Sequence, residues 1–251
     1  MKKTAIALLA VAATGLVAQA SYANNSYQSL TYFNNWSAIA LIAVDDDWSG
    51  VPGVLGFRGD NITAAVGVDP QTLTADDVPG VNDINANKPD PLAFFTGGVT
   101  EFELADPVVA LTGSGTADAP YIVLHIDATG KQNIAVRYVL RDLEGTNSTD
   151  DSVQPVALHF RTGPGAWTNV PGGFVADAST GPLAPPAVTP VLAVLPAAAN
   201  GAATLQIRII TSNAVGNDEW IGIDDIAVAG EDIPTPVVNS TWGKIKATYR
   251  D

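Results

Sequence analysis

The 251-residue chain contains no cysteine and only two histidines. Without cysteine, disulfides, thiolate metal sites and cysteine nucleophiles are all excluded. His125 and His159 each lie in mid-strand segments with no acid–base motif beside them. The chain also lacks a G-x-S-x-G nucleophile elbow and an H-E-x-x-H metal motif. The sequence therefore predicts a protein that is not an enzyme, with no catalytic residue, whose stability rests on its core.

Basic residues are scarce, since 12 Lys and Arg stand against 26 Asp and Glu, for a net charge of −14. In the body of the chain they are scattered, so no clustered surface for a phosphate backbone is expected. We therefore expect no nucleic-acid partner. Abundant Asp fits solubility or the binding of hard cations instead.

Long apolar runs are absent beyond the N-terminus. There, Lys2 and Lys3 precede an apolar stretch at 5–17 and the small-residue sequence Ala18-Gln19-Ala20, the order of a bacterial secretory signal peptide. The stretch is too short for a spanning helix of about 20 residues. We expect a signal peptide at 1–20, with cleavage after Ala23 as the alternative. The protein is then secreted, extracellular or periplasmic in transit, without a membrane span.

A helical period sustained over about 12 residues is also missing before residue 240. Short strand signals separated by Gly, Pro and Asn turns recur instead. They fall at 29–33, 38–44, 100–104, 108–112, 121–127, 133–141, 154–161, 188–195, 204–211 and 220–228. Residues 45–91 are rich in Gly, Pro, Asn and Asp, and we expect long loops with short strands there. This spacing predicts an all-β fold, a jelly-roll-like antiparallel β-sandwich over 21–230. Because Pro190 interrupts the strand at 188–195, we expect that strand at a sheet edge.

Two further segments follow the predicted domain. Residues 231–239 contain two prolines and predict an extended linker. Residues 240–251 place Trp242, Ile245 and Tyr249 on one helical face beside basic side chains, which predicts a short amphipathic basic tail. Such a tail can dock on a partner that the sequence does not identify, or it can be a frayed terminus.

The most informative segment is NAVGNDEWIGIDDIAV, residues 213–228. Strict alternation along this strand puts at least one of Asp224 and Asp225 on the same face as core residues. A buried carboxylate must be paired, hydrogen-bonded or metal-bound.

Several motifs carry a resemblance to a known domain: NIAVRYVLRDLEG at 133–145, QPVALHFR at 154–161, TNVPGGFVADASTG at 168–181 and the segment at 213–228. Upstream, 45–63, 67–73 and 113–120 belong to the same pattern. The chain resembles the β-sandwich domain near the N-terminus of large bacterial extracellular nucleases and phosphoesterases of the endonuclease/exonuclease/phosphatase type, and of other secreted proteins. The resemblance implies a secreted non-catalytic binding or structural module, here without the catalytic domain. Its alternatives are a carbohydrate-binding module and an accessory domain of an extracellular nuclease system.

The closing strand WIGIDDIAV is also similar to the last strand of jelly-roll carbohydrate-binding modules, some of which use an Asp there for a structural calcium. We therefore expect Ca²⁺ as a structural cofactor, because this ion prefers six to eight oxygen ligands. The alternative is that the acids cap turns or accept backbone N–H bonds. The candidate metal ligands are Asp224, Asp225, Asp218, Glu219, Asp45 and Asp47.

Aromatic side chains offer a second kind of site, because sugars stack on exposed rings. Core packing is the default for Trp36, Trp48, Trp167 and Trp220. Trp48, in a loop-rich segment, is the exception that we expect to bind a ligand. The expected partner is a glycan or a component of a cell surface or matrix.

Overall fold

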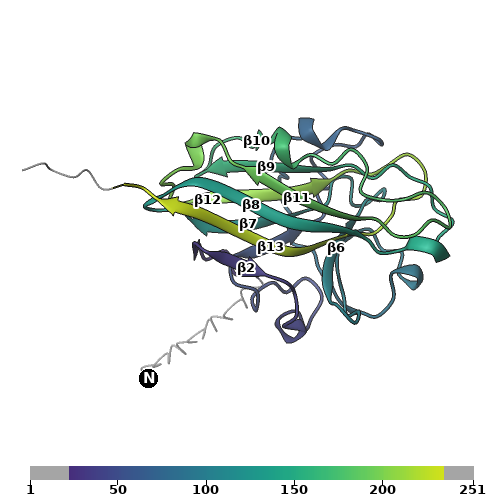
Figure 1. Ribbon diagram of the computed structural model, residues 1–251. Coiled ribbons are helices and arrows are strands. Elements are labelled where there is room, and N and C mark those ends of the chain that lie inside the picture. The colour runs from purple at the N-terminus through teal and green to yellow at the C-terminus, as the bar shows by residue number, and fades with distance from the viewer. Residues whose placement is uncertain (1–22, 235–251) are drawn as a thin grey trace, which may run out of the picture.

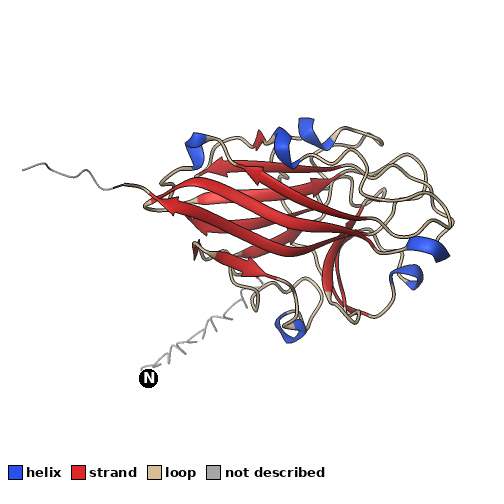
Figure 2. Ribbon diagram, in the orientation of Figure 1, coloured by secondary structure: helices blue, strands red, loops and turns tan. Residues whose placement is uncertain are grey.

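The computed structural model describes residues 23–234, and these form two stacked, mostly antiparallel β-sheets (Figures 1 and 2). They contain thirteen strands and only short 3-10 turns, without an α-helix. This confirms the predicted all-β sandwich. None of the described residues forms a helix long and apolar enough to cross a bilayer. The expected signal peptide, most of the expected linker and the expected tail lie outside the described residues.

The first sheet has β7 (Tyr121–Asp127), β12 (Leu205–Thr211) and β9 (Val156–Thr162) at its centre. Antiparallel β3 (Val54–Phe57) and the short parallel β1 (Gln28–Ser29) both pair with β7, and β10 (Thr168–Asn169) pairs with β9. Nearly every residue of β7 and β12 is buried. Loops therefore cover the outer face of this sheet, and the second sheet covers its inner face.

The second sheet runs in the order β11 (Val188–Val194), β8 (Lys131–Asp142), β13 (Ile221–Asp232), β6 (Val108–Thr112), β5 (Gly98–Phe102) and β4 (Asn85–Lys88). In addition, β2 (Tyr32–Asn34) pairs with the second half of β13. The main core lies between the two sheets and includes Leu124, Ile134, Leu158, Ile207 and Ile223.

The strands expected at 108–112 and 121–127 have the observed bounds, and β11 is an edge strand, as the proline predicts. The strand expected at 38–44 is wrong, because that segment contains the 3-10 turn at Ile39–Leu41. Short strands were expected without bounds among the loops of residues 45–91, and β3 and β4 lie there. The two-residue β10 was not expected. Strand β13 continues to Asp232, two residues into the expected linker.

A β-bulge in β13 changes the face on which its acids lie. Between the pairs Asp224↔Val139 and Ala227↔Arg137, three steps on β13 oppose two on β8, and Asp225 has a φ of 48°. One extra residue shifts the alternation, so Ile221 and Ile223 before it and Ile226 and Val228 after it all enter the core. Strict alternation therefore fails across the bulge, but the expectation that at least one Asp of the pair is buried holds for Asp224, which is 4% exposed.

Candidate ligand-binding pocket

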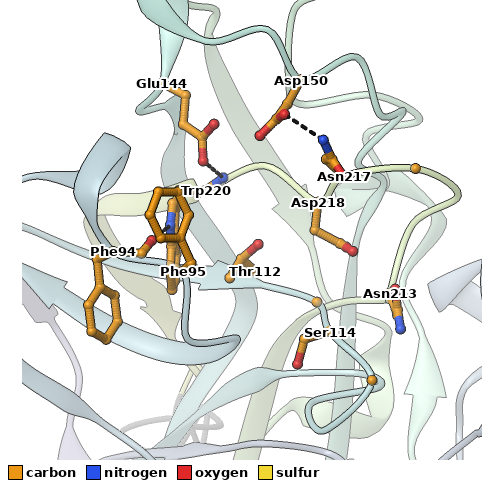
Figure 3. A pocket seen from close by; sticks show the side chains of 13 residues that line it. Phe94, Phe95, Thr112, Ser114, Glu144, Asp150, Asn213, Asn217, Asp218 and Trp220 are labelled. Atoms are coloured by element: carbon orange, nitrogen blue, oxygen red, sulfur yellow. Dashed lines mark hydrogen bonds between the residues drawn. The ribbon is translucent and has the colours of Figure 1, made fainter.

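Loops at one end of the sandwich surround a pocket of about 470 Å³. Its walls come from the segment before β5, the end of β6, the β8–β9 connection and the β12–β13 connection. Figure 3 shows the rings of Phe94 and Phe95 on one side and Asp150, Asn213, Asn217 and Asp218 on the other. The pocket thus combines segments that are far apart in the sequence.

The aromatic wall is held in place by Trp220, which is 2% exposed. Its ring stacks on Phe94 at 6.0 Å and 29°, and its Nε1 donates to the backbone oxygen of Phe94 at 3.0 Å. Phe102 packs edge-on against the same indole. Because Phe94 is fixed in this way, its neighbour Phe95 is presented to solvent with 85% of its surface exposed.

The polar wall is built by the β12–β13 connection. Asn217 Nδ2 donates to Asp150 Oδ1 at 2.9 Å, and Asp218 Oδ1 accepts the Ala214 N–H at 2.8 Å. Burial raises the pKa of Asp218 to about 6, against the opposing effect of that backbone bond. Burial likewise raises the pKa of Glu144 to about 7, although it accepts bonds from Ser148 Oγ and the Trp220 N–H.

The pocket can therefore offer an apolar ring face and several acceptor oxygens to one ligand. Glu144, Asp150 and Asp218 line it, and none of the described lining residues is basic. A ligand with apolar C–H faces and hydroxyl or amine donors complements these walls, whereas an anionic ligand would meet only like charges.

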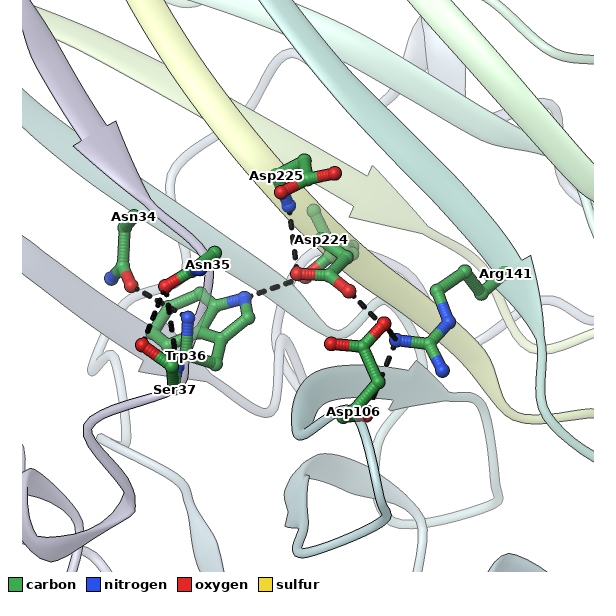
Figure 4. Close-up of polar contacts among 9 residues, drawn as sticks. Asn34, Asn35, Trp36, Ser37, Asp106, Arg141, Asp224 and Asp225 are labelled. Atoms are coloured by element: carbon green, nitrogen blue, oxygen red, sulfur yellow. Dashed lines mark hydrogen bonds and ion pairs between the residues drawn. The ribbon is translucent and has the colours of Figure 1, made fainter.

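Asp224 and Asp225 lie on β13, away from this pocket's walls. Asp224 is 4% exposed, and its Oδ2 accepts from Arg141 Nη1 at 2.7 Å (Figure 4). Its Oδ1 accepts the Asp225 N–H at 2.7 Å. The buried Asp224 carboxylate is therefore satisfied by a guanidinium and a backbone amide.

The acidic segment at residues 45–47 does not lie beside the acids of β13 either. Asp45 Oδ1 accepts the Ala86 N–H at 2.8 Å, and Asp47 Oδ1 accepts the Ser49 N–H at 2.8 Å. First-to-last strand pairing does occur, but it uses β2 and so does not carry Asp45 or Asp47 to the acids of β13. Among residues 23–234, no three acidic or histidine side chains are grouped to hold a metal ion. The six proposed ligands therefore do not form one preassembled site.

The remaining two proposed ligands, Asp218 and Glu219, lie next to each other at the entrance to β13. Asp218 lines the pocket and Glu219 does not. Glu219 is only 1% exposed, and its Oε1 has no hydrogen-bond partner. Burial, reinforced by the charges of Asp142, Glu144, Asp150 and Asp177, raises the pKa of Glu219 to about 8.

Trp48 is fully buried, and its Nε1 donates to the backbone oxygen of Asp83 at 2.9 Å. Its ring packs edge-on against Trp36, 6.5 Å away. The expectation that Trp48 binds a ligand is therefore corrected: the indole belongs to the hydrophobic core, where it contacts Trp36 and donates to Asp83. Trp36, Trp167 and Trp220 are also buried, as expected for core residues.

Both histidines are buried in strands of the first sheet. His159 Nδ1 lies 2.7 Å from Arg208 Nη2, and burial with the adjacent guanidinium lowers the pKa of His159 to about 3. His125 stands edge-on to Tyr27, and burial lowers its pKa as well. Each position is explained by packing.

Phe95 was missed by the sequence reasoning. Its segment reads as loop, and a Phe beside another Phe gives no local sign of which ring faces solvent. Which of the two rings is exposed depends on Trp220, more than a hundred residues later, which packs against Phe94.

No family model matches the chain, and no curated protein matches it. Distant similarity is found to solved β-sandwich structures. One is a family 28 carbohydrate-binding module specific for non-crystalline cellulose, with 12% identity, 54% of this chain and 83% of that chain covered, and a TM-score of 0.39. Another is the K2 cleaved adhesin domain of Lys-gingipain, with 18% identity, 50% of this chain and 73% of that chain covered, and a TM-score of 0.33.

An apo cyclase from Fischerella sp. is similar over 82% of this chain and 89% of its own, with 11% identity and a TM-score of 0.37. Such scores carry no information about what this chain binds. The comparisons give no support to the resemblance to nuclease-associated domains.

Proposed function

We propose that the protein is a secreted, non-catalytic β-sandwich module that binds a glycan in the pocket beside Phe95. The observation that carries this proposal is the 85% exposed Phe95 ring facing amide and carboxylate oxygens across a cavity of about 470 Å³. An aromatic side chain left in solvent gains from a ligand that covers it, and sugar rings present apolar C–H faces of suitable size.

The acidic lining of the pocket restricts which class of glycan can bind there. Glu144, Asp150 and Asp218 contribute acceptors, and no described lining residue contributes a positive charge. Neutral sugars or sugars bearing amines fit this lining. Uronic acids and sulfated sugars do not, because their anions would be desolvated beside carboxylates.

The test is binding of the purified protein to an array of neutral, amine-bearing and acidic polysaccharides, followed by titration of the best ligand. Phe95→Ala should weaken binding about tenfold or more, as expected for an aromatic anchor. Phe33→Ala is the matched control, because Phe33 is 58% exposed on β2 and does not line this pocket. Equal affinity of Phe95→Ala and the original chain would reject the pocket.

A parallel assay addresses the non-catalytic part of the proposal. We expect no hydrolysis of the bound glycan, of DNA or RNA, or of phosphate esters with Ca²⁺, Mg²⁺ or Mn²⁺ present. Turnover that stays with the protein through purification would refute it. Absence of binding to every glycan class would favour a structural role in a matrix or on a cell surface.

A further inference from the structure

Strand β11 forms one edge of the second sheet and, among the described residues, pairs with β8 alone (Figure 1). Two backbone hydrogen bonds at the ends of this pairing fix its phase. At one end, the Asp142 N–H donates to the Ala187 oxygen at 3.0 Å. At the other end, the Leu195 N–H donates to the Ile134 oxygen at 2.8 Å. Because antiparallel ladders bond every second residue, the odd-numbered residues of β11 bond β8, and the even-numbered ones face the open edge.

The open edge therefore offers the backbone N–H groups of Val188, Leu192 and Val194, since Pro190 has no N–H. It also offers the carbonyl oxygens of all four residues. Within residues 23–234, no backbone group bonds any of these donors or acceptors outside the strand pairing with β8. Unpaired ladder groups on an edge strand are a template for pairing with a further strand.

The side chains along this edge are apolar and face solvent. Val188 and Leu192 are each 67% exposed, and Val194 is 63% exposed. They project from the outer face of the sheet, because the intervening Val191 and Ala193 enter the core. A row of exposed aliphatic side chains gains free energy when a second strand and its side chains remove it from water.

No charged side chain protects this edge. The net charge of −14 opposes self-association of the protein in general. Residues 178–207, which contain β11 and its flanking loops, nevertheless include no Asp, Glu, Lys or Arg. Edge strands are commonly protected by charged side chains and by proline, and here only Pro190 is present. Two copies can therefore bring these edges together without placing like charges opposite each other.

The sequence of β11, VTPVLAV, suits pairing with a second copy of itself. In an antiparallel pair centred on Val191, Val188 lies opposite Val194 of the second copy, and Pro190 lies opposite Leu192. Every edge N–H of both strands then meets a carbonyl oxygen. A register centred on Leu192 leaves the Val188 N–H beyond the end of the other strand, and one centred on Pro190 does the same to the Val194 N–H. The pattern of donors therefore favours the register centred on Val191.

We propose that two copies of the protein form a symmetric dimer by antiparallel pairing of their β11 strands, centred on Val191. The pairing joins the second sheets of both copies into one continuous sheet and covers the apolar side chains of both edges. A two-fold contact of this kind closes on itself, so it produces a dimer and no filament. The proposal does not depend on glycan binding, because the protein alone is the probe.

Sedimentation equilibrium of the purified protein from micromolar to millimolar concentration measures the association. We expect the mass to rise from that of one chain to that of two. Leu192→Lys should weaken the association about tenfold or more, because each copy then brings a positive charge into the contact. Val215→Lys is the matched control, since Val215 is 74% exposed in the β12–β13 connection and should leave the association unchanged. A protein that stays monomeric at millimolar concentration would overturn the proposal, and so would a Leu192→Lys variant that dimerises like the original chain.

Disulfide cross-linking tests the register, and a chain without cysteine gives no competing thiol. Val188→Cys combined with Val194→Cys places each new thiol opposite one of the second copy in the proposed pairing. The Cα atoms of such hydrogen-bonded pairs lie about 5.5 Å apart, which a disulfide accepts. Oxidation should therefore give a covalent dimer.

The matched control is Val188→Cys combined with Leu192→Cys, because these two positions oppose each other only in the register centred on Pro190. It should cross-link far less than the first variant. Failure of the first variant to form a covalent dimer, or equal cross-linking of the control, would overturn the proposed pairing.

Discussion

Arg141 Nη1 donates to Asp224 Oδ2 at 2.7 Å from a diagonal position across the β8–β13 pair. Gly222 lies directly opposite Arg141 and has no side chain, so the guanidinium can reach along β13 to Asp224. This contact supplies the partner that the buried Asp224 carboxylate requires.

Arg141→Met should therefore destabilise the protein by about 3 kcal/mol, because it leaves a buried carboxylate without its partner. Urea denaturation gives the free energy of unfolding. Adding Asp224→Asn to Arg141→Met should recover most of the loss, since the uncompensated charge is then gone. A double variant as unstable as Arg141→Met would show that Arg141 acts through packing instead.

Trp48→Ala should destabilise the protein by about 3–5 kcal/mol, the range for truncating a large buried aromatic side chain. Removal of the fully buried indole also leaves the Asp83 backbone oxygen without its donor. Phe95→Ala, by contrast, should leave the urea midpoint nearly unchanged because its ring is 85% exposed. Similar midpoints for the two variants would contradict the assignment of Trp48 to the core.

Substitutions at Asp225 test the β-bulge, because the φ of 48° at this residue disfavours β-branched side chains. Asp225→Val should cost about 1–2 kcal/mol in unfolding free energy through backbone strain. Asp225→Gly should be tolerated, since glycine adopts positive φ readily. Equal stability of the two variants would mean that the bulge moves to another residue.

Stability should be highest at mildly acidic pH. Burial raises the pKa of Glu219 to about 8, of Asp83, Glu101 and Glu144 to about 7, and of Asp218 to about 6. The folded protein holds these protons after the unfolded chain has lost them, so the unfolding free energy falls as pH rises from about 4.5 to about 8.

His159 acts in the opposite sense. The pKa of His159 in the folded protein is about 3, below the ordinary value of 6.5. Its contribution to the free energy of unfolding is therefore complete above pH 6.5 and is lost as pH falls toward 3. Urea titrations across this range should give a maximum near pH 4, because above about pH 4.5 five carboxylates outweigh one imidazole. In metal-free buffer, Glu219→Gln should flatten the decline above pH 7. A stability that rises steadily from pH 5 to pH 8 would contradict these shifts.

Much of the fold was predictable because its signals are local. Alternation and flanking turns place β6 and β7 correctly, and Pro190 identifies β11 as an edge strand, since proline cannot donate to a second neighbour. The bounds of β3 and β4 escaped prediction because these strands are short and lie among Gly, Pro and Asp residues. Their pairing with β7 and β5 depends on partners elsewhere in the chain.

The site was harder to predict because its parts are not local. The sequence correctly required that the buried acid of the last strand have a partner, but one bulge residue redirected the strand and Arg141 supplied that partner. The exposure of Phe95 and the isolation of Glu219 depend on which distant connections meet at one end of the sandwich. By itself, the sequence determined the β-sandwich, through short-range periodicity and turn chemistry. The tertiary structure alone decided which acids are paired, which ring faces solvent and where a ligand fits, because burial and charge compensation arise only when distant segments pack together.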